Sequence, residues 1–267
     1  MQLAIALPSE SHCGPQRAEY WASGDERVRI GLSITTGRTS NGAGWDGSVF
    51  VLVDGVSGEF SLDGGSQSDH HAMHLPAESS RTIEVELGEV APGRHLVNVL
   101  AAFTGHLIVP KLSADLWLYR DATCRGDQAP PVETRPAIAP SGGSYLVDRR
   151  RPDSVLSFPD SHLLVGTDHG IPLTLHMEDD FLLPSDRMVV AFLDGKQISL
   201  GALGLHPRFK IPVGSEPQEI DFELTDLPVD GQRHRVFFFV VGADEQPPGS
   251  QADKRPASDL LTAFTFE

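Results

Sequence analysis

The chain has very little cysteine and no long apolar run. Its 267 residues include two cysteines, Cys13 and Cys124. Two cysteines exclude a disulfide-rich scaffold and cannot by themselves make a zinc site. A single bridge between them stays open, with free thiols in a reducing compartment as the default. No segment approaches the roughly 18 consecutive apolar residues of a membrane span.

Positive charge is scarce as well. The 21 basic residues face 37 acidic ones, which gives a formal net charge of −16. A field of this sign repels nucleic acid and anionic membranes, so neither is an expected partner, and it favours solubility. The N-terminal apolar run carries no positive charge and stops at Pro8, which is too short for a secretory signal. We therefore expect a soluble, cytoplasmic protein.

The common catalytic motifs are missing too. The sequence has no Gly-x-Ser-x-Gly elbow, no phosphate-binding Gly-x-x-x-x-Gly-Lys-Ser/Thr loop and no Gly-x-Gly-x-x-Gly after a strand. We therefore expect a protein that is not an enzyme and that needs no cofactor.

What the chain does have is an internal duplication. VFVLVDG at 49–55 returns as VVAFLDG at 189–195, and IEVEL at 83–87 returns as IDFEL at 220–224. The blocks recur in the same order, and 49 to 189 is a displacement of 140 residues. Repetition at a fixed spacing indicates a duplicated domain.

The repeated blocks have the pattern of β-strands. Residues 27–34 and 171–177 alternate apolar and polar side chains, as half-buried strands do. In 82–87 the alternation predicts that Ile83, Val85 and Leu87 point inward and that Glu84 and Glu86 point outward. The Asp-Gly pairs that close 49–55 and 189–195 favour tight turns. The 26 glycines and 20 prolines break any helical period.

These patterns predict an all-β protein made of two tandem antiparallel β-sandwiches. We place an N-terminal extension at 1–23 and the first sandwich at 24–121. A linker rich in Pro, Gly and Ser follows at 122–159, and the second sandwich spans 160–267.

The segment VAPGRHLVNV at 90–99 resembles a passage of fibronectin type III and bacterial immunoglobulin-like domains. In those domains a Pro-Gly turn precedes a core strand, and an aromatic residue near the strand start ties back to the turn. The chain departs from the pattern in having no Cys…Trp…Cys core, and His95 and His234 stand where Tyr is usual. We expect both histidines to make the same corner hydrogen bond. The resemblance implies recognition, spacing or assembly more than catalysis.

Asp69-His70-His71-Ala72-Met73-His74 is the sharpest local signal of chemistry. Three imidazoles and a carboxylate within six residues are a candidate metal set, of the kind a metal-dependent hydrolase uses. The stretch is expected to be a polar loop between strands, and we do not assign a metal to it. Its histidines are instead candidate partner contacts.

Aromatic residues outside the core strands are the other candidate contacts. Trp45 lies in a glycine-rich stretch, and Tyr20 and Trp21 precede the first strand. An exposed ring at any of these positions could anchor a protein partner. Trp45 could also stack on a sugar, as in a carbohydrate-binding module.

The sequence thus predicts a non-catalytic binding or assembly subunit that recognises a protein partner through sandwich loops and edges, within a larger complex such as a phage or bacterial assembly. The contact set is Tyr20, Trp21, Trp45, His70, His71 and His74. The alternatives are a glycan or small-molecule ligand centred on Trp45, and a metal-dependent hydrolase centred on Asp69 to His74.

Overall fold

The structure is a computed structural model, and its described residues form two compact units. The first unit comprises described residues between 2 and 121, and the second comprises those between 145 and 266. The described ranges are 2–6, 19–22, 27–37, 44–104, 112–121, 145–156, 162–163, 170–177, 185–211, 218–242 and 259–266.

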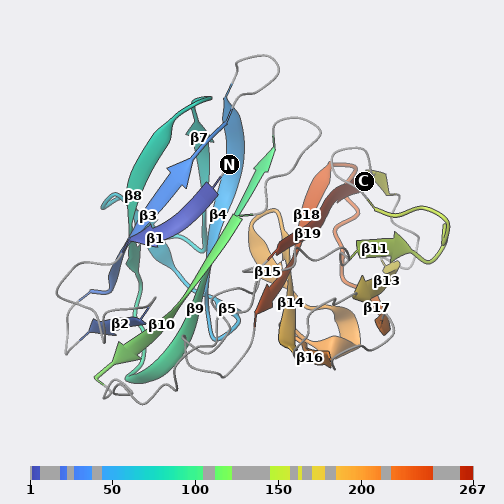
Figure 1. The fold of residues 1–267 in the computed structure, drawn as a ribbon. Helices are drawn as coiled ribbons and strands as arrows, with labels where there is room; N and C mark the ends of the chain where they lie inside the picture. The colour runs from blue at the N-terminus through green and yellow to red at the C-terminus, as the bar shows by residue number, and fades with distance from the viewer. Residues whose placement is uncertain are drawn as a thin grey trace, which may run out of the picture. The chain divides into compact units, whose positions relative to one another are not determined.

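The first unit is a sandwich of two β-sheets (Figure 1). The smaller sheet has the order β1 (Gln2–Ala6), β3 (Arg29–Thr35), β8 (Ser80–Leu87), β6 (Phe60–Leu62). The larger has the order β2 (Glu19–Ala22), β10 (Leu112–Arg120), β9 (Gly93–Thr104), β4 (Trp45–Val53), β5 (Val56–Ser57), with β7 (His70–Leu75) also paired to β4. All pairs are antiparallel except β2 with β10.

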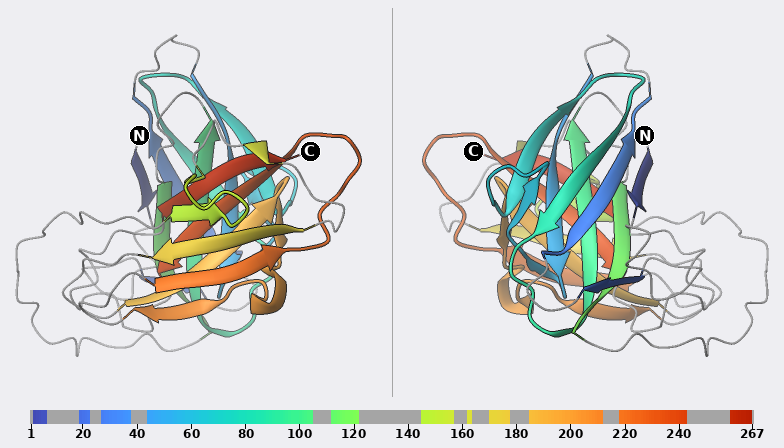
Figure 2. Two further views of the ribbon diagram at one scale, coloured as in Figure 1. Left: turned by 90° about the vertical axis from the view of Figure 1, so that its right-hand side faces the viewer. Right: turned by 90° about the vertical axis from the view of Figure 1, so that its left-hand side faces the viewer.

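The second unit repeats this plan with one strand fewer in its small sheet. That sheet has the order β11 (Tyr145–Asp148), β13 (Ile171–Met177), β17 (Gln218–Leu224), and Figure 2 shows the three side by side in its left view. The large sheet has the order β12 (His162–Leu163), β19 (Asp259–Phe266), β18 (His234–Gly242), β14 (Ser185–Leu193), β15 (Lys196–Ile198), with β16 (Arg208–Ile211) on β14. The place of β6 is taken by a short 3-10 helix, η1 (Gly201–Leu203).

The strand order identifies the type of sandwich. In an immunoglobulin-like domain, strands A, B, E and D form one sheet and G, F and C the other. The orders β1-β3-β8-β6 and β10-β9-β4 reproduce this arrangement. The expected all-β fold with two duplicated antiparallel sandwiches is therefore confirmed, and the second copy lacks strand D among its described residues.

Alternation of side chains builds the two cores. In β3 and β8 every second residue points inward, and Ile30, Leu32, Ile83 and Val85 are at most 1% exposed. The large sheets are apolar on both faces, since Phe50 and Phe192 are fully buried although they lie outside the two sandwich cores. This two-sided burial explains the dense apolar runs of β4 and β14, which lack the simple alternation of β8.

Both predicted Asp-Gly turns are confirmed. Asp54 and Gly55 have φ of 54° and 90°, and Asp194 and Gly195 have φ of 47° and 95°. Two successive residues with positive φ make the primed hairpin turn whose twist matches the flanking strands. Each turn joins a core strand to a short edge strand, β4 to β5 and β14 to β15.

The strand pairing moves the expected domain limits. Residues 2–6 and 19–22, expected to lie in an extension, form β1 and β2 of the first sandwich. Residues 145–148, expected in the linker, form β11 of the second. These short segments carry too few side chains for a clear pattern, and their pairing to the edges of β3, β10 and β13 makes them strands. Cys13, Cys124 and residues 122–144 lie outside the described residues.

One further expectation is corrected. The predicted loop at Asp69 to His74 is largely strand β7, because residues 70–75 pair with β4. Glu86 points outward as predicted, but it is only 5% exposed because two arginines cover its carboxylate. In the part of the chain that the structure describes, no helix has the length and apolar character that crossing a membrane requires.

Candidate functional site

The repeated histidines form the same hydrogen-bonded corner in both units. In the first unit, His95 Nδ1–H donates to Asp54 Oδ2 at 2.7 Å, and His95 Nε2–H donates to the Ala91 carbonyl at 2.9 Å. Asp54 Oδ1 also accepts the Leu96 N–H at 2.9 Å. This Asp–His clasp, Asp54 with His95 and Asp194 with His234, ties the Asp-Gly turn to the start of the neighbouring core strand, β9 or β18. The predicted corner hydrogen bond is confirmed.

The second clasp carries more charge. His234 Nδ1–H donates to Asp194 Oδ2 at 2.6 Å, and its Nε2–H donates to Asp230 Oδ1 at 2.9 Å. Hydrogen bonds first to Asp194 and then to Asp230 raise the pKa of His234 above its ordinary 6.5. The bond from His234 in turn lowers the pKa of Asp230. Two carboxylates on one ring hold the imidazolium form, so this histidine is engaged as a cation rather than free to act as a base.

The three histidines of β7 do not converge. His70 Nδ1–H donates to Asp69 Oδ1 at 3.0 Å, and His70 stacks against Phe50. His71 Nε2–H donates to the Phe60 carbonyl at 2.8 Å, and His74 Nδ1–H donates to Asp46 Oδ1 at 2.8 Å. Alternation along the strand places His71 on the opposite face from His70 and His74, and those two lie four residues apart along β7.

The histidines of β7 are therefore not arranged to bind one metal ion. The hydrogen bond from His70 is the largest cause that lowers the pKa of Asp69, so these two side chains are engaged with each other. Within the described ranges, no cluster of three or more His, Cys, Asp or Glu side chains is placed to hold a metal ion.

Two of the candidate aromatic contacts, Tyr20 and Trp45, lie inside the first sandwich. Trp45 is 8% exposed, belongs to the core, and donates its Nε1–H to the Gly37 carbonyl at 3.3 Å. Tyr20 is also buried in that core. Neither ring has a face available for stacking on a sugar or a partner. The side chain of Trp21 lies outside the described residues.

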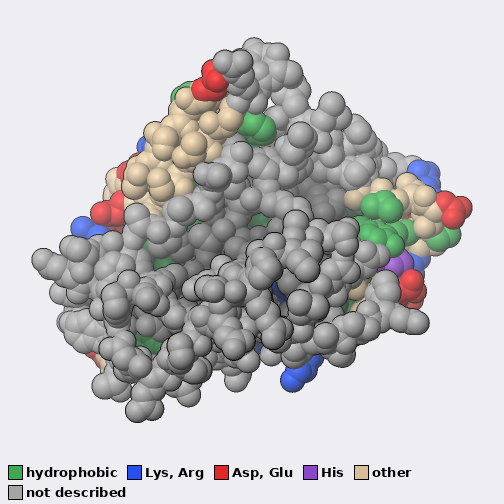
Figure 3. All heavy atoms as spheres, viewed as in Figure 1, with side chains coloured by type: hydrophobic (Ala, Val, Ile, Leu, Met, Phe, Trp, Pro, Cys, Tyr) green, Lys and Arg blue, Asp and Glu red, His purple; other side chains and the backbone are tan. Residues whose placement is uncertain are grey.

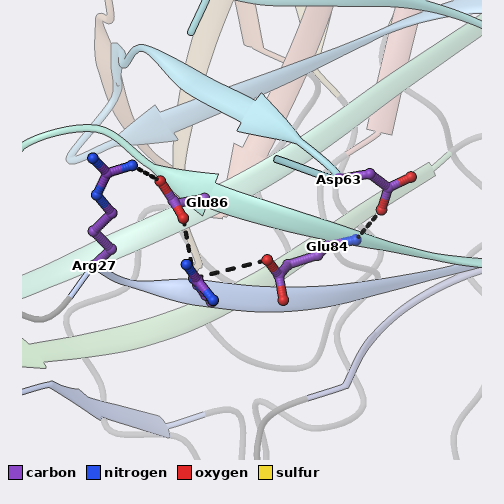
Figure 4. Close-up of polar contacts among 5 residues, drawn as sticks. Arg27, Asp63, Glu84 and Glu86 are labelled. Carbon is purple, nitrogen blue, oxygen red and sulfur yellow. Dashed lines mark hydrogen bonds and ion pairs between the residues drawn. The ribbon is translucent and has the colours of Figure 1, made fainter. Parts of the chain in front are cut away.

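The outer face of the first small sheet carries an ion-pair network (Figure 4). Arg27 and Arg29 both bind the Glu86 carboxylate, and Arg29 also lies 3.7 Å from Glu84. The hydrogen bond from Arg27 is the largest cause that lowers the pKa of Glu86. On the face shown in Figure 3, acidic and basic side chains of the described residues are interspersed rather than gathered by sign.

The two sandwiches differ at one sheet edge. In the first, β6 pairs with the C-terminal half of β8, and Asp63, which follows β6, covers the next part of the same strand edge. Asp63 N–H donates to the Glu84 carbonyl at 2.8 Å, and the Glu84 N–H donates to Asp63 Oδ1 at 2.9 Å (Figure 4). Both main-chain groups of Glu84 are thereby satisfied.

The counterpart of Glu84 in the second unit is Asp221, in the middle of β17. Described strands pair with β17 on the β13 side alone. The helix η1 replaces β6 and packs on the end of β17 near Glu223, where a Cβ on Gly201 would overlap the Glu223 carbonyl. This edge was not found from the sequence. The signal that could have found it is the change from Phe60-Ser61-Leu62-Asp63 to the glycine-interrupted segment 200–204.

The outer face of β11, β13 and β17 is a small grid of cross-strand contacts. Tyr145 stacks on His176 with ring centroids 4.5 Å apart, and His176 Nδ1 lies 3.3 Å from the Glu219 carboxylate. Thr174 Oγ1–H donates to Asp221 Oδ1. Arg149 reaches across the sheet to lie 3.7 Å from the Asp221 carboxylate, so this strand already holds one cation of its own chain.

Comparisons with known proteins give no family. No protein-family model matches the chain, and no curated protein matches its sequence. Solved structures that align with it include the CBD12 domains of CALX1.2, at 10% identity over 100% of both chains with a TM-score of 0.26. Others are the CupB2 chaperone of Pseudomonas aeruginosa (10% identity, 92% of this chain and 98% of that one, TM-score 0.25) and the fibronectin(III)-like modules of Clostridium thermocellum CbhA (11% identity, 98% and 93%, TM-score 0.23). Likeness at such scores carries no argument, so the architecture rests on the strand order given above.

Proposed function

We propose that this protein is a non-catalytic binding or assembly subunit that recognises a protein partner through a sandwich edge, as part of a larger complex. The first support is that the side chains a catalytic or ligand-binding site would use are already engaged within the protein. Each described histidine of the candidate sites is engaged in a structural hydrogen bond, and the rings of Tyr20 and Trp45 are packed in the core.

The observation that carries the proposal is the difference between the two copies at strands β8 and β17. The duplication keeps the core strands, the Asp-Gly turns and the Asp–His clasp. Among the described residues, no strand closes the edge of β17 as β6 closes the edge of β8. An open strand edge is a template for pairing with another chain, and natural proteins commonly cover such edges.

Affinity capture from the native source, combined with a mass determination of the intact complex, tests the proposal. We expect a partner in fixed stoichiometry that survives near-physiological salt. A protein that stays monomeric, captures no partner and turns over a substrate would overturn it.

A further inference from the structure

A single hydrogen bond shows which residues of β17 direct their main-chain N–H and C=O groups toward β13 and which direct them away. Arg149 N–H donates to the Pro172 carbonyl at 3.1 Å, so Pro172 directs its main-chain carbonyl toward β11. In an antiparallel ladder, alternate residues direct both main-chain groups to the same neighbour. Leu173 and Leu175 therefore pair toward β17, with Phe222 and Ile220 as their partners in register.

The residues of β17 that alternate with these partners direct their main-chain groups away from β13. They are Glu219, Asp221 and Glu223. The helix η1 packs at Glu223, whereas no described strand lies beside Glu219 and Asp221. The open edge thus offers the N–H and C=O groups of two consecutive outward residues, which is enough to pair with a short extended segment.

Side chains on the two faces of β17 define what can pair there. On the inner face Ile220 is half-buried, while its counterpart Ile83 in the closed first sandwich is 1% exposed. On the outer face the side chains of Glu219 and Asp221 are 68% and 62% exposed. A pairing segment therefore meets an apolar surface on one face and two carboxylates on the other.

We propose that the open edge of β17 binds an extended segment of another protein that alternates apolar and basic residues. The apolar side chains cover Ile220, and the Lys or Arg side chains lie beside Glu219 and Asp221. The Arg149 guanidinium already lies 3.7 Å from the Asp221 carboxylate, so this face can accommodate a guanidinium. The inference rests on the proposed function and names the chemistry of its partner.

A second copy of the chain is the poorer occupant of this edge. Antiparallel pairing of two β17 strands would bring the carboxylates of one copy opposite those of the other. Like charges in cross-strand positions are destabilising, and charged side chains on an edge strand disfavour self-pairing. The same carboxylates attract a basic strand.

The test uses the full chain and a capped synthetic hexapeptide of alternating valine and lysine. Two control peptides are the same sequence with a central proline, which removes a main-chain donor, and a valine–glutamate version. Titration calorimetry measures affinity, and hydrogen exchange locates the bound peptide. We expect saturable binding of the valine–lysine peptide, slower amide exchange at 219–221, and at least a tenfold loss for both controls.

Variants of the chain assign the site. Asp221→Lys should weaken the affinity for the valine–lysine peptide at least tenfold. Glu84→Lys makes the same charge change at the counterpart residue on the closed edge, and it should leave this affinity unchanged. Asp221→Asn retains an oxygen for the Thr174 hydroxyl and loses only the charge, so it should weaken binding without a loss of folding, as checked by thermal unfolding. Added salt should weaken binding further.

Three results would overturn the inference: no saturable binding, binding unaffected by either Asp221 variant, or a dimer of the chain that forms through β17. The variants also separate it from the proposed function. If Asp221→Lys still captures the native partner, the assembly role stands and the β17 edge is the wrong surface. If wild-type protein captures no partner and binds no peptide, both fail.

Discussion

His234 Nε2 lies 2.9 Å from Asp230 Oδ1, whereas the corresponding nitrogen of His95 faces the Ala91 carbonyl at the same distance. One copy of the clasp thus replaces a neutral acceptor with a carboxylate. The two clasps hold equivalent corners of equivalent sandwiches, but their charge differs.

The charged clasp makes stability depend on pH. Because the pKa of His234 is raised in the folded state, its contribution is fully present below the unfolded value of 6.5 and is lost as pH rises through the higher folded value. Urea unfolding of wild type and His234→Gln from pH 5 to 9 measures this. We expect the difference between the two in unfolding free energy to shrink as pH rises, and a difference that is constant or grows with pH would contradict it.

The Glu86 network predicts a shift in the opposite sense. With Arg27 and Arg29 in place, the pKa of Glu86 is lowered from 4.5, so its contribution is present above that value and is lost as pH falls through the folded pKa. Replacing both arginines by methionine should raise the Glu86 pKa, as measured by carboxyl carbon chemical shifts in NMR. Arg81→Met, which removes the partner of Asp63 instead, is the matched control and should leave the Glu86 titration unchanged.

Alanine substitutions at Gly201 and Gly204 compare the cost of a steric clash with the cost of an unfavourable backbone conformation. Both have positive φ, 57° and 87°, but a Cβ on Gly201 would overlap the Glu223 carbonyl while a Cβ on Gly204 meets nothing within 4 Å. Gly204→Ala should lose about 1–3 kcal/mol of unfolding free energy, because a φ of 87° with a ψ of −167° lies in a region that only glycine adopts readily. Gly201→Ala should lose more, because η1 must also shift away from β17. Equal losses in chemical denaturation would show that η1 does not press on the strand.

Main-chain closure predicts a contrast in hydrogen exchange. The amide of Glu84 donates to Asp63, and the amide of Asp221 has no described strand beside it. In native conditions the Asp221 amide should exchange faster than the Glu84 amide. Asp63→Ala should speed exchange at Glu84, while Asp63→Asn, which keeps an acceptor oxygen and tolerates the φ of 49°, should largely preserve it. Similar rates for the two wild-type amides would mean that the β17 edge is covered.

Local sequence patterns were sufficient to predict the core strands and their turns. Alternation over six or more residues identified β3, β8 and β13, and the return of IEVEL as IDFEL identified β17. The Asp-Gly pairs identified both tight turns, because each signal depends on contacts within a few residues. The recurrence of His95 and His234 likewise predicted a shared corner bond. Outside the described residues, the linker at 122–144 and the thiols stay expectations.

What the sequence determined by itself is therefore the duplicated all-β architecture, since side-chain period and turn chemistry are local properties. What only the tertiary structure decided is which polar groups meet. It buried Glu86 beneath two arginines, packed Trp45 in the core, and assigned the histidines of β7 to separate partners. Within the described ranges it also gave β8 an edge strand, β6, and gave β17 none, because strand pairing depends on segments far apart in the chain.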